Sequence, residues 1–400
     1  MKKFRLISAL LMLFGLTATA QESISVNEVL IAPGKQAMME VMFHFNENHD
    51  YVSYQFKVNL PDGISFVADD DDQVIVELGD GQPTARFSKE MPVSSAIMKG
   101  FSNPSTVIAA NDGVLVKIAV IADDDIEVDT ELTGSITGVV FAHSNAVGVS
   151  FSDANFKVKM TEKIILDENY TWTPFATTNN ENLIVKRTIN AGEWSTVCFP
   201  FAMSVDKLKA AFGNDYDLEE FTGYDVEKDG NDKVIGLTLN FTKNTKAAKI
   251  NTPYIIKTTQ DVTEFEVNAK VNPGITKKTI VVEDDETGEE VEVASVTGTF
   301  KAGTIVPKNS LFLSGNQFWY SAGLTKMKGF RGYFTLNDVL ADVINAGAKV
   351  SLNFGGETTD VKQINGDGND DRYYDLQGRH VQNPSKKGLY INNGKKEVVK

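Results

Sequence analysis

The chain has 400 residues, 42% of them hydrophobic and 10% aromatic, which is enough for two or three domains with buried cores. Its formal net charge of −15 disfavours a nucleic-acid partner, because binding to a phosphate backbone depends on clustered Lys and Arg side chains. The single cysteine, Cys198, excludes an intramolecular disulfide, and its apolar neighbours predict a buried thiol rather than a nucleophile.

Residues 1–20 have the pattern of a secretory signal peptide. Basic residues come first, the apolar run 6–16 follows, and an A-x-A cleavage site ends at Ala20, so that Gln21 is the expected first mature residue. The apolar run is much shorter than the ~20 residues that a membrane span needs. We therefore expect an exported protein without a transmembrane segment in the mature chain.

Residues 22–161 alternate between apolar and polar side chains. Every second residue from Met39 to Phe45 is apolar, and the stretches 52–60 and 114–120 repeat this pattern. Turn sequences such as Pro-Asp-Gly and Asn-Asp-Gly separate the stretches. Many short strands with regular turns predict a β-sandwich.

Residues 162–356 predict a second, mainly β domain with one or two short helices. Ser204 is a good N-cap and Gly213 a good stop for a helix over 205–212, and 336–349 is a candidate for the second helix. The segment 357–372 is polar, acidic and rich in glycine, as expected of a tether. Residues 373–400 then predict a small C-terminal β-meander.

No catalytic motif is present, and the four histidines have no spacing typical of a metal site or a catalytic triad. We therefore expect a protein that is not an enzyme, although paired carboxylates in the second domain remain an alternative. Aromatic rings can stack on the apolar faces of sugars, and core packing is the alternative for each of them. The candidates for glycan stacking are Trp319, Tyr320 and Trp194.

Acidic clusters at 69–72 and 123–125 are expected to be solvated loops, with calcium binding as the alternative. In the tether, alternating oxygen-bearing residues resemble the start of a calcium loop, but Arg372 replaces the turn glycine and Gly378 replaces the closing glutamate. The metal candidates are Asp367, Asn369 and Asp371.

The stretches "YVSYQFKVNLPDGISF" and "NDGVLVKIAVIA" resemble the cohesin-like β-sandwich of secreted Bacteroidales proteins, a fold related to carbohydrate-binding modules. The resemblance implies a binding module and carries over no contact residue. The second domain is similar to an uncharacterised β-rich domain of the same proteins, through "GEWSTVCFPF", "INTPYIIK", "LFLSGNQFWYSAG" and "KGFRGYF".

The C-terminal residues resemble the sorting domain of type IX secretion cargo, which implies contact with an export machinery. An ordinary small β-domain is the alternative. The residues that match the sorting pattern include Tyr374, Asp375, Leu376, Gly378, Arg379, Gly388, Tyr390 and Lys400.

These observations favour a non-enzymatic protein, secreted or at the cell surface, that recognises a glycan or an extracellular protein through the cohesin-like β-sandwich. A structural or adhesive surface component is the second hypothesis, and a glycan-active enzyme with a carboxylate site is the third. No cofactor is expected, with calcium as the open alternative.

Overall fold

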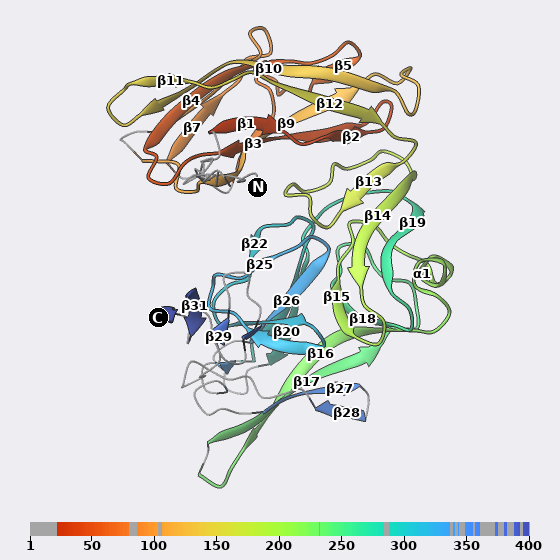
Figure 1. The fold of residues 1–400 in the computed structure, drawn as a ribbon. Helices are drawn as coiled ribbons and strands as arrows, with labels where there is room; N and C mark the ends of the chain where they lie inside the picture. Colours follow the sequence, from red (N-terminus) through yellow and green to blue (C-terminus); the bar gives the residue numbers. More distant parts are fainter. Residues whose placement is uncertain are drawn as a thin grey trace, which may run out of the picture. The chain divides into compact units, whose positions relative to one another are not determined.

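The computed structural model describes residues 22–79, 86–102, 106–231, 233–283, 288–336, 339–340, 343 and 349–354, and the backbone of five short strands after them. The chain divides into two units, Met1–Glu162 and Lys163–Lys400. Both consist mainly of β-strands, which confirms the predicted all-β class (Figure 1). The predicted signal peptide 1–20 and Gln21 lie outside the described residues.

Unit 1 contains two β-sheets, drawn as two layers in Figure 1. One sheet has the order β1-β3-β9-β5, with β6 also on β9: β1 Ser23–Val26, β3 Gln36–His44, β9 Asp112–Ala122, β5 Ile64–Phe66 and β6 Val76–Leu78. The other has the order β2-β12-β10-β4-β8-β7, with β11 on β10: β2 Val29–Ile31, β12 Ala154–Met160, β10 Glu131–His143, β4 Tyr51–Asn59, β8 Ile97–Ser102, β7 Phe87–Glu90 and β11 Gly148–Ser150.

One hydrophobic core joins the two sheets, so unit 1 is a β-sandwich. The predicted alternation of β3 is confirmed, since Met39, Val41 and Phe43 are all buried in this core. Tyr54, Phe56 and Val58 of β4 enter the core from the other sheet. Their polar neighbours in the sequence consequently point away from the core.

A β-bulge interrupts the pairing of β10 with β4. Thr137 lies opposite Lys57 and Val140 opposite Gln55, so β10 has one extra residue in this interval. Gly138 takes a positive φ of 63° here, a conformation that glycine adopts without strain. The bulge restores Val139 to the core and turns Val140 outward.

The described strands of unit 2 form four sheets, of which the last is at the C-terminus, and one β-ribbon of two short strands. The first has the order β13-β14-β19: β13 Ile164–Asp167, β14 Glu181–Ile189 and β19 Val262–Ala269. The second has the order β15-β18-β16-β17-β27-β28: β15 Trp194–Val197, β18 Tyr254–Thr258, β16 Tyr216–Lys228, β17 Val234–Lys243, β27 Lys349–Phe354 and β28 Glu357–Asp360.

The third sheet has the order β20-β21-β26-β23-β24: β20 Lys277–Glu283, β21 Glu290–Thr299, β26 Arg331–Leu336, β23 Ser310–Ser314 and β24 Gln317–Tyr320. The ribbon pairs β22 Thr304–Ile305 with β25 Lys326–Met327. One hydrophobic core is shared by residues of the second and third sheets, so these two sheets pack face to face. The opposite side of the third sheet faces away from this core.

The helix expected after Ser204 is confirmed as α1, Val205–Phe212, which lies beside β19 (Figure 1). The Ser204 side chain accepts a hydrogen bond from the backbone N–H of Lys207, and Gly213 follows the helix with a φ of 87°. Leu208, Ala211 and Phe212 are its buried residues. Most of the second helix expected at 336–349 lies outside the described residues.

The segment expected as a tether begins with β28, whose residues pair with β27. Residues 361–372 lie outside the described part of the chain. Beyond them, four strands form a small sheet of order β30-β29-β31-β32: β29 Tyr373–Tyr374, β30 His380–Val381, β31 Gly388–Asn392 and β32 Lys395–Val399. Among the described residues, no helix has the length and hydrophobicity needed to cross a membrane.

Candidate functional site

The outward side of β10, β4, β8 and β7 in unit 1 is the candidate binding surface, called here the outer face. Its side chains lie in cross-strand rows, and each is at least partly exposed. The rows are Val140–Gln55–Lys99–Glu90, Ala142–Ser53–Phe101–Ser88 and Thr137–Lys57–Ile97. The alternation of the strands forces these residues outward, because their neighbours fill the core.

Phe101 is the most prominent apolar residue of the outer face. Its exposed fraction is 43%, and its direct cross-strand neighbours are Ser53 and Ser88. Such small side chains cannot cover an aromatic ring. An exposed aromatic side chain with small neighbours is a typical anchor of a protein interface, where the partner removes the ring from water.

The charges of the outer face, at Lys57, Lys99 and Glu90, lie in the two rows that follow the row of Phe101 along the strands. Glu90 and Lys99 form an ion pair of 2.5 Å in which both side chains are well exposed. The row of Phe101 contains no ionisable group. Phe101 therefore lies in an uncharged row, and the row beside it contains the ion pair of Lys99 and Glu90.

One end of unit 1 brings together His143, Asp50 and Ser144, the residue types of a catalytic triad. The Nδ1 atom of His143 contacts one carboxylate oxygen of Asp50, and the Ser144 hydroxyl donates to the other. These bonds, first that of Ser144 and then that of His143, hold the pKa of Asp50 below its usual value. The serine is bonded to the carboxylate rather than to the imidazole, so this geometry does not activate a nucleophile.

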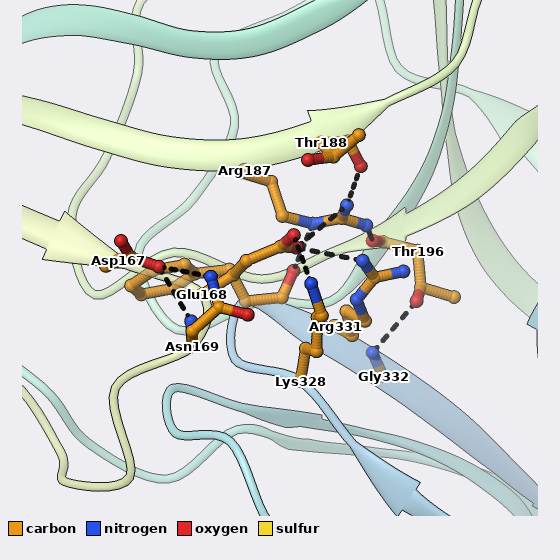
Figure 2. A network of polar contacts seen from close by, with 10 residues as sticks. Asp167, Glu168, Asn169, Arg187, Thr188, Thr196, Lys328, Arg331 and Gly332 are labelled. Carbon is orange, nitrogen blue, oxygen red and sulfur yellow. Dashed lines mark hydrogen bonds and ion pairs between the residues drawn. The ribbon is translucent and has the colours of Figure 1, made fainter. Parts of the chain in front are cut away.

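Unit 2 contains a polar network centred on the buried carboxylate of Glu168 (Figure 2). Glu168 accepts hydrogen bonds from Arg331 at 2.8 Å, Lys328 at 3.2 Å and Arg187 at 3.4 Å. Figure 2 shows the three cationic side chains converging on this single carboxylate. No local pattern in the sequence indicates the network, because its members come from segments about 20 to 160 residues apart.

Arg187 is completely buried and is also held by backbone carbonyl groups (Figure 2). Its guanidinium donates to the carbonyl oxygen of Thr196 at 2.8 Å, to that of Phe330 at 3.4 Å, and to that of Thr188. Burial lowers the pKa of Arg187, the positive charge of Arg331 lowers it further, and Glu168 opposes both effects. With its donors bound to the protein, Arg187 is suited to joining strands and not to binding a substrate.

The pKa of Glu168 is set by opposing effects. Burial alone would raise it, but the charges of Arg331, Arg187 and Lys328 together keep it below its ordinary value. The group is therefore a stable carboxylate at neutral pH. A general acid needs a raised pKa, so the network does not provide one.

Two other features bear on catalysis. Cys198 is buried, as predicted, and burial raises the pKa of its thiol, which makes it a poor nucleophile. A shallow hollow in unit 1 is lined by Asp69 and Glu90 among others. Asp69 accepts hydrogen bonds from the backbone N–H groups of Asp71 and Gln73, and Glu90 pairs with Lys99. Both carboxylates are thus engaged in local structure.

The three predicted stacking aromatics do not form one surface. Trp319 has an exposed fraction of 43%, whereas Trp194 has 8% and belongs to the core of unit 2. Tyr320 packs against the same core, because neighbouring residues of a strand point to opposite sides. The prediction is therefore wrong for Trp194, which the core covers. Tyr320 is partly exposed and lies on the core side of β24, so Trp319 is the stacking candidate that stays.

The metal candidates Asp367, Asn369 and Asp371 lie outside the described residues, as do the side chains of the sorting-like motif. In the part of the chain that the structure describes, no group of three or more His, Cys, Asp or Glu side chains has a metal-binding arrangement. The acidic loops 69–72 and 123–125 lie within this part.

No protein-family model matches the chain, and no curated protein sequence matches it significantly. Among solved structures, the chain is similar to the sixth cohesin of scaffoldin B from Acetivibrio cellulolyticus, which was solved in complex with a Cel5 dockerin. The identity is 18% and the TM-score 0.29, and the match covers 35% of this chain and 98% of that one. A non-cellulosomal cohesin from Archaeoglobus fulgidus has 12% identity, a TM-score of 0.28, and coverage of 36% and 94%.

Proposed function

We propose that this chain is an exported, non-enzymatic binding protein, and that unit 1 binds an extracellular protein through its outer face. The observation that carries the proposal is the exposed ring of Phe101, which lies between Ser53 and Ser88 on the outward side of this sheet. A protein partner is favoured over a glycan at this surface because its rows contain one aromatic side chain, not a platform of several.

The experiment is site-specific photo-cross-linking from position 101 in the full mature chain, mixed with the extracellular proteins of its source. The matched control carries the cross-linker at Val128, which has the same exposed fraction of 43% and lies in the connection between β9 and β10. We expect one discrete protein adduct from position 101 and none from position 128. Equal labelling from both positions, or no adduct from position 101, would reject the outer face as the binding surface.

Export is the second part of the proposal, and it rests on the sequence of the leader and of the C-terminal motif. Deletion of 373–400 is expected to leave the protein inside the cell envelope, whereas the intact chain reaches the cell surface or the medium. The measurement is immunoblotting of cell fractions. Unchanged surface and medium levels after the deletion would contradict a sorting role for these residues.

A further inference from the structure

Three aromatic residues lie side by side on the third sheet of unit 2. Trp319 of β24 is directly opposite Phe312 of β23, and Phe312 is directly opposite Tyr333 of β26. Neighbouring strands are ~4.8 Å apart, so the row extends over roughly 10 Å. Trp319, Phe312 and Tyr333 are called the aromatic row.

The aromatic row lies on the side of the sheet that faces away from the core. Leu311, Leu313 and Phe334 alternate with its members along the strands, and these three residues are buried in the core. Phe312 and Tyr333 are partly exposed, and Trp319 is the most exposed of the three. The row is therefore accessible from solution.

The orientation of the Trp319 ring is fixed before any ligand arrives. Its indole N–H donates a hydrogen bond of 3.0 Å to the carbonyl oxygen of Ser314 on the adjacent strand. This bond restricts rotation of the ring, so binding costs less side-chain entropy than at a free tryptophan. A fixed indole is suited to stacking on a flat apolar surface.

The surroundings of the aromatic row are polar without an unbalanced charge. Thr297 continues the row on β21, and Ser314 and Gln317 form the adjacent cross-strand pair. The nearest charged side chains along the same face are Lys277, which pairs with Glu292 at 2.7 Å, and Arg331, which pairs with Glu168. An anionic ligand would have to compete with these carboxylates, whereas a neutral ligand would not.

We propose that the aromatic row is a binding site for a neutral polysaccharide, whose sugar rings stack on Trp319, Phe312 and Tyr333. The row supplies apolar ring faces, and Thr297 and Gln317 supply hydrogen-bonding groups beside them. This site lies in unit 2 and goes beyond the protein-binding function proposed for unit 1. The two proposals are independent, so a failed test of one does not contradict the other.

The test uses affinity electrophoresis of the full mature chain in gels that contain β-1,4-glucan, xylan, mannan or, as the acidic comparison, polygalacturonate. We expect at least one neutral polysaccharide to retard the wild type. Trp319→Ala should weaken this retardation about tenfold, and Phe312→Ala or Tyr333→Ala about three- to tenfold. Trp319→Phe keeps a ring and should retain part of the binding.

Tryptophan fluorescence gives a second readout, because Trp172 and Trp194 are buried and Trp319 is exposed. The polysaccharide that retards the protein should shift the emission of the wild type to shorter wavelength, and this shift should be absent in Trp319→Phe. The matched control is Ile235→Ala on β17, since Ile235 is exposed to 42% and lies on a different sheet.

Four outcomes would overturn the proposal. The first is that no neutral polysaccharide retards the wild type, and the second is that only polygalacturonate does. The third is that Trp319→Ala lowers thermal stability while leaving binding unchanged, which would mean that the chain itself covers the ring. Equal effects of Trp319→Ala and Ile235→Ala on retardation would also count against the site.

Discussion

Replacement of Glu168 by Gln tests the polar network of unit 2 most sharply. The substitution keeps the shape of the side chain but removes the negative charge that faces three cations, among them the completely buried Arg187. Breaking a buried ion pair from one side typically costs about 3–5 kcal/mol, because the remaining charge is left without compensation. We expect a loss of this size in the free energy of unfolding of unit 2.

The assay is urea unfolding followed by tryptophan fluorescence, which reports on unit 2 because all three tryptophans lie in it. Lys328→Gln is the matched control, since the Lys328 side chain is half exposed and an exposed ion pair contributes at most about 1 kcal/mol. A loss below about 1 kcal/mol in Glu168→Gln, or an equal loss in both variants, would refute the reasoning.

The same variant has a defined pH dependence. Because the folded protein holds the pKa of Glu168 below its ordinary value near 4.5, the carboxylate stabilises unit 2 above that pH. This contribution is lost as the pH falls from about 4.5 through the lower pKa of the folded state. Glu168→Gln should therefore lose less stability than the wild type over this acidic range, and an identical acid dependence would contradict the assignment.

Three further substitutions make separate predictions. Burial raises the pKa of Glu219 to about 6, so its ionisation destabilises the fold as the pH rises from about 4.5 to 6. Glu219→Gln should therefore raise the free energy of unfolding of unit 2 at pH 7 by about 1 kcal/mol, as measured by urea unfolding. Gly298→Ala should lower the free energy of unfolding by about 1–3 kcal/mol and lower the melting temperature, because its Cβ would lie 2.4 Å from the Cys198 sulfur. Its control is Gly230→Ala, which should have little effect on the melting temperature because open space surrounds Gly230. Ser204→Ala should cost about 1 kcal/mol by removing the N-cap of α1, and unchanged unfolding would disprove that role.

Local patterns in the sequence predicted much of the fold. Alternation identified the inward residues of β3, and Ser204 and Gly213 defined α1, because these signals lie within one strand or one helix. The alternation expected from Val52 to Leu60 holds for Tyr54, Phe56 and Val58. It fails at Val52, which is partly exposed while its neighbour Tyr51 is buried, because the pairing of β4 with β10 shifts its register at this point.

The candidate sites depend on pairing between distant segments, which one sequence does not reveal. Trp319 was identified as a candidate, but its partners Phe312 and Tyr333 follow from the registers of β23 with β24 and with β26. The burial of Trp194 likewise follows from sheet packing. Which residues of β10 belong to the outer face of unit 1 depends on the bulge at Gly138. Because of this bulge, Val139 points into the core and Val140 points outward.

The most direct test of the central claim is isothermal titration calorimetry with the partner protein that cross-linking from position 101 captures. This partner is titrated separately into the wild type, Phe101→Asp and Val128→Asp. If the exposed outer face of unit 1 binds the partner, Phe101→Asp should weaken the affinity by at least about tenfold, since a loss of 1.4 kcal/mol or more is typical of an aromatic anchor residue. Val128→Asp should bind like the wild type, and both variants should keep its melting temperature. Undiminished affinity of a correctly folded Phe101→Asp variant would contradict the claim.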